Sequence, residues 1–329
     1  MSFLAVLVAL LIEQAKPLAP NNWVHRAMGI WGRWLWRQTY AGGRKHAWAT
    51  WVLTVGAPVA LSVAIYWLLS GVSLILAWCW NVAVLYLTLG FRQFSHHFTG
   101  IRDALDQGDE AKARQLLAEW KLQGHGVETS DLPRSEILRH VIEHSVLSAH
   151  RHVLGVFLWF AVLAALGLGP AGAVLYRFAE WMPRLWRSSW LHEETSQEGD
   201  APLITVGEQT WSWIDHVPAR ATSLGFAVVG NFEDAVDCWR NFSQKLAVEG
   251  RSDNDGIILA ATSGAMGVRL GGPALAPGAA VDADANEAVA TPGVEPQNAH
   301  LRSAVGLVWR SVVLWMVLLA LLTLAKLLS

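Results

Sequence analysis

Four long apolar stretches constrain this chain more than any other feature of its sequence. Each approaches or reaches the ~20 apolar residues that a helix needs to cross a bilayer core. Every backbone polar group inside a bilayer must be bonded within the chain, so such stretches fold as helices. The sequence therefore predicts a mainly α, polytopic helical membrane protein with cytoplasmic helical segments. The stretches are residues 47–69, 72–91, 153–176 and 304–325.

The composition agrees with a protein that lies in a lipid bilayer. Charged residues make up 16% of the chain, against about a quarter in soluble proteins. There are 19 Trp residues but 4 Tyr, and Trp favours the membrane–water interface. A net charge of −2 gives no basic field for phosphate backbones, so we expect the lipid bilayer and no nucleic acid as partner. The two cysteines, Cys79 and Cys238, exclude a disulfide framework and a four-cysteine zinc site.

Breaks in the apolar pattern divide the chain into segments. The run Gly167-Leu168-Gly169-Pro170 interrupts the third stretch and predicts a kinked span or a re-entrant pair of half-helices. Pro218 predicts a break in a later amphipathic region. The expected segments are an N-terminal apolar helix with a basic interfacial segment (1–46), a transmembrane hairpin (47–91), a soluble helical segment (92–152), a kinked or re-entrant membrane segment (153–178), an amphipathic helical region (179–272), a flexible linker (273–303) and a C-terminal transmembrane helix (304–325).

Basic residues at the ends of the spans predict the topology. Residues 13–46 are rich in Lys and Arg and almost free of acids, which places them in the cytoplasm. The hairpin then returns residues 92–152 to the same side. A simple third span would export residues 178–303, and a re-entrant helix would keep them inside, which we favour. No basic residue precedes the apolar run 1–12, so we expect a retained interfacial or half-inserted helix there rather than a signal peptide.

The sequence His140-Val-Ile-Glu143-His144 matches the H-x-x-E-H pattern of one metalloprotease class. On a helix the two histidines would share a face, as zinc requires, with the glutamate as a base. A third ligand is not evident, and a five-residue pattern recurs by chance. We therefore favour a polar helix face and expect no metal.

The run from Ser263 to Gly272 is rich in glycine and contains one arginine, Arg269. It lacks the Lys-Ser/Thr ending of a P-loop and the preceding strand of a dinucleotide fold. Taken alone, the run predicts a close-packed helix followed by a turn.

The same run carries a resemblance to a known family. Residues 252–272 resemble, without gaps, the C-terminal signature of the CobD/CbiB membrane proteins of cobalamin biosynthesis, which reads Ser-Pro-Asn-x-Gly, a small-residue helix and Gly-Val-Arg-Leu-Gly-Gly. Val217-Pro218-Ala219-Arg220 resembles the family's Ile-Pro-Ala-Arg, and 169–177 resembles its Gly-Pro-x-Gly-Ala…Tyr-Arg. Arg139 and Glu143 fall where the family has Arg…Glu. The matching positions of the signature are Ser252, Asn254, Gly256, Gly264, Gly267, Arg269, Gly271 and Gly272.

Several acids of the family pattern are missing. Members that attach aminopropanol phosphate to adenosylcobyric acid carry Glu-Asn-x-x-Asp, and here these positions are Leu147, Ser148 and Arg151. Leu259 replaces the acid of a Gly-Trp-Pro-Glu stretch. Nucleotide-driven ligation needs carboxylates to hold magnesium, so these departures put the ordinary reaction in doubt. Those members also carry Asn-Thr-x-Asp and a following Lys. In this chain the same positions are occupied by Glu180, Trp181, Pro183 and Ser189.

A second branch of the superfamily, the AmpE membrane proteins linked to beta-lactamase regulation, is similar at other positions. Glu13 after the first apolar run, Arg151 and Asp215 resemble that branch, as does the hydrophobic C-terminal span after a linker. AmpE-like proteins lack the Gly-Val-Arg-Leu-Gly-Gly signature. The chain thus resembles a divergent member between the two branches, at a bacterial inner (cytoplasmic) membrane and with several spans.

The resemblance suggests which residues form a ligand site. The retained arginines could converge on an anionic group, because guanidinium forks bind phosphate or carboxylate in bidentate fashion. The alternative is that they pair with Glu143, Glu180 or Asp215 and hold the fold. The candidate ligand-binding residues are Arg139, Glu143, Arg177, Arg220, Asn254 and Arg269.

Three functions follow as hypotheses. The first is a ligand- or partner-binding accessory protein without the usual synthase acids, whose partner is a corrinoid, another anionic ligand or a membrane protein. The second is an adenosylcobinamide-phosphate synthase that uses corrinoid, ATP and Mg²⁺ and has rebuilt its acid set. The third is an AmpE-like signalling or structural subunit of a membrane assembly. The rebuilt acid set would comprise Glu143, Glu180, Asp253 and Asp255.

Overall fold

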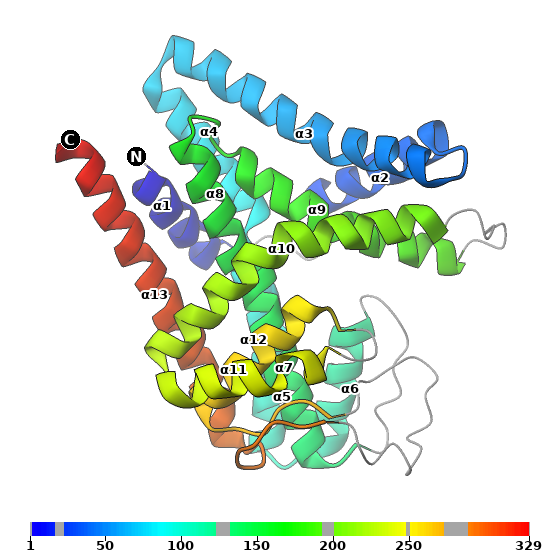
Figure 1. The fold of residues 1–329 in the computed structure, drawn as a ribbon. Helices are drawn as coiled ribbons and strands as arrows, with labels where there is room; N and C mark the ends of the chain where they lie inside the picture. Colours follow the sequence, from blue (N-terminus) through cyan, green and yellow to red (C-terminus); the bar gives the residue numbers. More distant parts are fainter. Residues whose placement is uncertain are drawn as a thin grey trace. The chain divides into compact units, whose positions relative to one another are not determined.

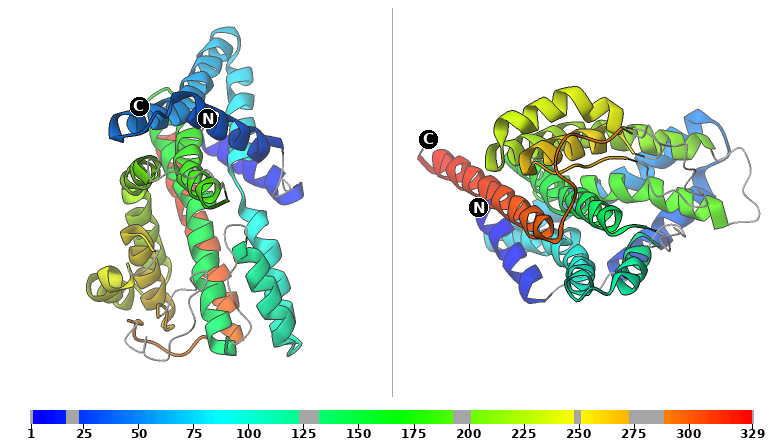
Figure 2. Two further views of the ribbon diagram at one scale, coloured as in Figure 1. Left: turned by 90° about the vertical axis from the view of Figure 1, so that its right-hand side faces the viewer. Right: turned by 90° about the horizontal axis from the view of Figure 1, so that it is seen from below.

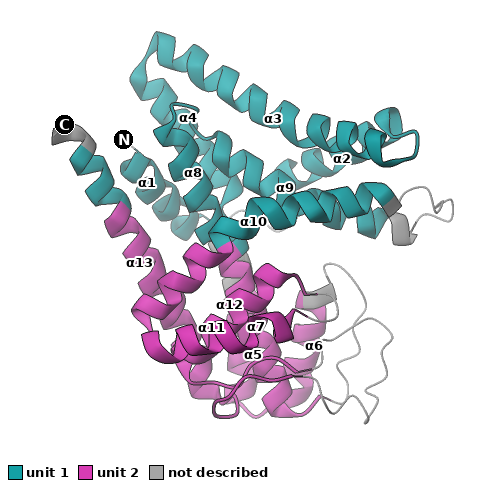
Figure 3. Ribbon diagram, viewed as in Figure 1, with its two compact units in different colours: residues 1–93, 151–218, 319–329 teal, residues 94–150, 219–318 magenta. Residues whose placement is uncertain are grey.

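Every regular element in the described part of the chain is a helix (Figure 1). The computed structural model describes residues 2–16, 23–122, 132–192, 201–247, 251–272 and 289–328. The mainly α-helical class is thereby confirmed. The helices form two compact units (Figure 3): unit 1 is Met1–Gln93, Arg151–Pro218 and Leu319–Ser329, and unit 2 is Phe94–His150 and Ala219–Leu318.

Unit 1 contains the hairpin that the first two long apolar stretches predict (Figure 2). Helix α3 (Arg44–Val72) and helix α4 (Leu74–Thr88) pack together, and the side chain of Ser73 caps α4 by accepting from the Ile75 amide. The two arms are unequal, because α3 has 29 residues and α4 has 15. Since a full crossing takes ~20 residues, α4 is shorter than the span expected there.

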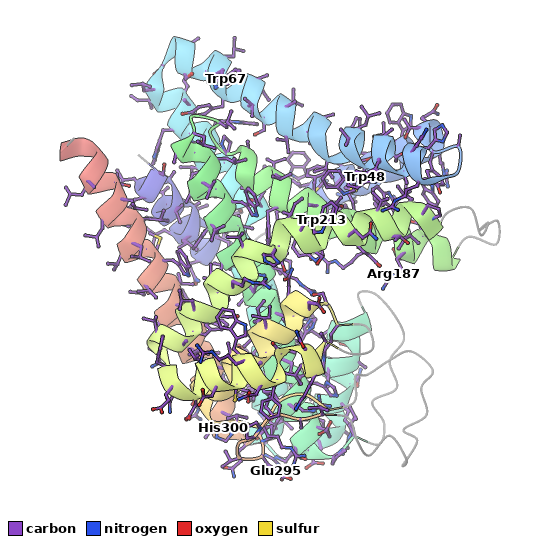
Figure 4. The ribbon with its side chains drawn as sticks, viewed as in Figure 1. Trp48, Trp67, Arg187, Trp213, Glu295 and His300 are labelled. Carbon is purple, nitrogen blue, oxygen red and sulfur yellow. The ribbon has the colours of Figure 1, made fainter. Side chains whose placement is uncertain are left out.

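Three further helices pack around this hairpin. Helix α1 (Ser2–Ala15) contacts α4, while α2 (Trp23–Thr39) and α9 (Ala171–His192) contact α3. The first part of α10 (Ala201–Val229) also belongs to unit 1. Trp48 of α3 and Trp213 of α10 lie face to face (Figure 4), with ring centroids 6.2 Å apart.

The glycine-rich break in the third apolar stretch forms the turn between two helices. Helix α8 (Gly155–Ala165) ends there, and α9 packs back against α8. Gly167 and Gly169 have φ of +79° and +58°, which glycine adopts without steric cost. A single π-turn, His150–Leu154, joins α8 to α7 (Arg134–Ala149), so the apolar helix is Arg134–Ala165 and begins earlier than the sequence suggested.

The expected break at Pro218 does not occur. Helix α10 continues through this residue to Val229. Proline removes one helical hydrogen bond, to the carbonyl four residues earlier. That carbonyl belongs to Ile214, and it accepts a hydrogen bond from the indole of Trp159 instead. Chain reversal follows Gly230, where the side chain of Asn231 caps α11 (Phe232–Leu246).

Unit 2 is built on its own apolar core. Helices α5 (Phe91–Asp106) and α6 (Glu110–Leu122) pack with α7, the start of α13 (Asn298–Leu328) and the segment after α12 (Asp253–Met266). Helices α11 and α12 form the most extensive helix pair of this unit. Their backbones approach so closely that a Cβ on Gly256 would lie 2.4 Å from the Ser243 carbonyl oxygen, which only glycine avoids. The buried core includes Ile101, Leu105, Leu117, Ile137, Val268, Leu270 and Leu301.

The protein is a helical membrane protein. Three helices of the described chain, Arg44–Val72, Arg134–Ala165 and Asn298–Ala325, are long and apolar enough to cross a bilayer. Two shorter apolar helices, Ser2–Ala15 and Leu74–Thr88, accompany them.

Candidate functional site

The Gly-Val-Arg-Leu-Gly-Gly run forms the turn that ends α12. Gly267 has φ +65° and closes the helix in the left-handed conformation, which favours glycine. The side chains of Val268 and Leu270 are buried in the unit 2 core, while Arg269 between them is exposed. The motif thus presents one cation at the surface of a tightly fixed loop.

Thr291 holds this loop in place. Its hydroxyl accepts from the Leu270 amide at 2.8 Å and also contacts the hydroxyl of Ser263. Its amide donates to the Leu270 carbonyl at 2.8 Å. Val294 and Val268 form one of two isolated bridges between these segments.

The expected linker at 273–303 is therefore ordered in its last part. Residues 289–294 pair with the motif, and α13 already begins at Asn298. Residues 273–288 lie outside the described residues. Composition alone suggested a linker, but backbone hydrogen bonds to the motif order this end of it.

Glu143 lies at the centre of a buried ion cluster behind the motif. One of its oxygens accepts from Arg139 at 3.1 Å and from the Gly271 amide at 2.8 Å. The other accepts from Arg251 at 2.8 Å. Arg139 also pairs with Glu136, so two guanidinium groups face two carboxylates. Arg139 and Glu143, two of the candidate residues, are thus bonded to each other.

The two histidines of H-x-x-E-H do not assemble a metal site with Glu143. His140 is buried beside Arg139, with its Nε2 3.0 Å from the guanidinium. His144 lies edge-on to Trp120 at 4.5 Å. Within the described residues no group of three His, Cys, Asp or Glu side chains could hold a metal ion.

Arg220 and Asn254 meet at the start of α12. Arg220 donates to the Asn254 side-chain oxygen at 3.4 Å. Ser252 and Asp255 form a reciprocal capping box there, which satisfies backbone amides of the first turn. Asp255 is thus occupied in the cap, whereas Asp253 is exposed.

Two of the lost family acids correspond to leucines that pack in one cluster. Leu259 of α12 is fully buried, and Leu147 of α7 packs in the same cluster with Leu246 and Ala260. The resemblance places a carboxylate at each of these two positions in synthase members. Here the space is filled by hydrocarbon, which cannot bind magnesium or position a phosphate.

Arg177 belongs to a separate cluster, in unit 1. It donates to Glu180 at 3.3 Å, and Arg184 pairs with the same carboxylate. Burial alone would raise the pKa of Glu180, but Arg184 and Arg177 outweigh it and hold the pKa below its ordinary value. Tyr176 donates to Asp215 at 2.7 Å, so the candidate counter-ion Asp215 is bonded to a phenol.

Inside unit 2 the structure brings the candidate residues together in two pairs. Arg139 joins Glu143, and Arg220 joins Asn254, while Arg269 extends from the neighbouring motif. Sequence reasoning missed two residues that complete this region, Arg251 and Thr291. Arg251 directly precedes Ser252, the first residue of the family signature. This neighbourhood was the one feature of the sequence that could have pointed to Arg251.

Comparisons with known proteins identify the family of this chain. The family described as CobD/Cbib protein matches residues 2–308. Cobalamin biosynthesis protein CobD of Stutzerimonas stutzeri is 29% identical over 282 residues, which are 84% of this chain and 82% of the relative. CobD of Chromobacterium violaceum is 32% identical over 193 residues, which are 59% of this chain and 55% of the relative. No solved structure matches the chain. The chain belongs to the CobD/Cbib protein family.

Proposed function

We propose that this chain is a corrinoid- or partner-binding accessory member of its family rather than a ligating synthase. The observation that carries the proposal is the joint packing of Leu147 and Leu259 in one apolar cluster. Both positions would supply acids in a synthase, and an apolar pair cannot take over that chemistry. The relatives' names place them in cobalamin biosynthesis, so a corrinoid is the first ligand to test.

The acids that remain support the same proposal. Glu143 is neutralised by Arg139 and Arg251, and Asp255 caps a helix. A carboxylate that already accepts such bonds has little capacity to hold Mg²⁺ beside ATP. The ligand surface would instead use Arg220 and exposed Arg269, whose guanidinium groups suit carboxylate or phosphate. We place the protein in the bacterial inner membrane as a multi-pass protein.

Complementation tests the loss of catalysis. A cobalamin auxotroph that lacks its own synthase is transformed with this chain, and membrane expression is verified by immunoblot. We expect no growth without added cobalamin, whereas an active CobD relative restores it. Growth supported by this chain would establish the synthase reading instead, with corrinoid, ATP and Mg²⁺ as its reactants.

Direct binding tests the ligand. The purified protein is passed through a desalting column with a corrinoid precursor, and the visible absorbance that elutes with protein is measured. We expect binding that Arg220→Gln with Arg269→Gln reduces and that Arg302→Gln, at an exposed position of the same unit, leaves unchanged. Absence of binding would exclude the corrinoid as ligand. The partner would then be a membrane protein, as expected for a structural or AmpE-like signalling subunit, and co-purification would identify it.

A further inference from the structure

Unit 1 contains a cavity of about 200 Å³ between α2, α3, α4 and α9. Its walls are mainly apolar, formed by residues such as Ile65 of α3, Val84 of α4 and Val174 of α9. Corrins are macrocycles, and even drug-sized ligands occupy clefts of ~300–1,000 Å³. The cavity is thus of a size for a hydrocarbon chain.

One part of the cavity wall is cationic. Arg177 supplies the charge there, beside the imidazole of His25. Arg177 shares its partner Glu180 with Arg184, and Arg151 also acts on that carboxylate electrostatically. Two guanidinium groups thus contact one carboxylate, and Arg177 brings the resulting excess of positive charge to the cavity wall, where it suits an anion.

A second polar group in the cavity is evidence that the cavity binds a ligand. Ser62 of α3 lines the cavity and is 4% exposed, and its hydroxyl has no hydrogen-bond partner among the described residues. A buried hydroxyl without a partner costs free energy. A polar ester or phosphate oxygen in the cavity would satisfy it.

The cavity reaches the apolar surface of α3, which indicates where its occupant comes from. Leu61 lines the cavity and is nevertheless 62% exposed, on a helix long and apolar enough to cross a bilayer. From the other side His25 belongs to α2, a helix rich in Trp and Arg with exposed Trp23 and Trp34. Such a composition is typical of helices at the headgroup level.

We propose that this cavity binds an acyl chain of an anionic phospholipid, with the headgroup phosphate at Arg177. The apolar walls take the chain, the guanidinium group selects the negative headgroup, and Ser62 donates to an oxygen near the glycerol. This site lies in unit 1 and is independent of the corrinoid proposal, which rests on residues of unit 2.

Native mass spectrometry of the full chain tests the site. The detergent-purified protein is titrated with phosphatidylglycerol or with phosphatidylcholine of identical chains. We expect phosphatidylglycerol to bind about tenfold more tightly, equivalent to about 1.4 kcal/mol. Arg177→Gln should abolish this preference, whereas Arg187→Gln, on the same helix and labelled in Figure 4, should preserve it.

A second variant tests the site even if Arg177→Gln does not fold. Val84→Phe should fill the cavity and reduce binding of both lipids while the circular dichroism spectrum and elution volume stay unchanged. Equal affinity for the two lipids, or full binding by folded Val84→Phe, would overturn the proposal. Competition by inorganic phosphate alone at equal concentration would also overturn it, because the site would then recognise an anion without its chain.

Discussion

The indole nitrogen of Trp159 donates a 3.0 Å hydrogen bond to the backbone carbonyl of Ile214. Pro218 lies four residues further along α10 and has no N–H to offer that carbonyl. The tryptophan therefore replaces the hydrogen bond that the proline removes, and α10 remains continuous.

The same device occurs in α3. Pro58 leaves the carbonyl of Thr54 without its helical donor, and the indole of Trp31 donates to it at 3.0 Å. Some of the many tryptophans thus have a role beyond the membrane interface, since they satisfy backbone groups at prolines.

We expect Trp159→Phe to destabilise the protein by ~0.5–1.5 kcal/mol, because the Ile214 carbonyl loses its donor. Pro218→Ala restores a helical N–H, so the double variant should lose less than the sum of the two single changes. Urea unfolding in detergent, followed by circular dichroism, measures both. Trp23→Phe, at an exposed tryptophan, is the control, and strict additivity would contradict this account.

Thr291→Val should destabilise unit 2 by ~1–3 kcal/mol. The substitution keeps the shape but leaves the buried Leu270 amide without the hydroxyl that it bonds. Thermal unfolding of the variant is compared with that of Thr323→Val, whose hydroxyl bonds only within its own helix among the described residues. A melting temperature equal to that of the unsubstituted protein would show that the loop does not depend on Thr291.

Glu143→Gln should cost ~3–5 kcal/mol, because it leaves the buried guanidinium group of Arg139 and the half-buried one of Arg251 short of a counter-charge. Chemical unfolding provides the measurement. The matched change Glu119→Gln, at a side chain of α6 bonded to Gln115, should have little effect. If both variants unfold at the same denaturant concentration, the cluster contributes no stability.

Leu259→Ala should cost ~2–5 kcal/mol, as expected for a fully buried leucine. The exposed Leu224→Ala in the same unit serves as its control. Equal unfolding free energies for the two variants would contradict a packed cluster around Leu147 and Leu259. Such a result would also remove the observation on which the accessory function rests.

His25 should make the protein less stable at mildly acidic pH. Burial, followed by the charges of Arg177 and Arg184, lowers its pKa from 6.5 to about 4. Between these values the unfolded chain binds a proton that the folded chain excludes. Its contribution to stability is complete above pH 6.5 and declines as the pH falls towards 4.

Unfolding midpoints between pH 7 and 4 check this expectation. The midpoint should fall more steeply in the unsubstituted protein than in His25→Gln, while His46→Gln, at an exposed histidine, should follow the unsubstituted protein. Parallel profiles for all three would refute the role of His25.

The sequence by itself determined the helical membrane class and most of the helices. Apolar stretches must satisfy their backbone groups locally in a bilayer, so length and composition sufficed for α3 and α13. The break after α8 was visible in Gly167, Gly169 and Pro170, because tolerance of positive φ is a local property of glycine. The family signature likewise marked the end of α12.

Tertiary structure alone decided what the signature residues contact. Glu143 and Arg251 are 108 residues apart in sequence, and their ion pair arises from the packing of α7 near α12. The sequence predicted a break at Pro218 because local helix propensity takes no account of distant side chains. In the structure the indole of Trp159, from α8, bonds the carbonyl that the proline leaves without a donor. The substitution of family acids by Leu147 and Leu259 was visible in the sequence. Only the fold brings these two leucines into one apolar cluster, because burial depends on neighbours that are distant along the chain.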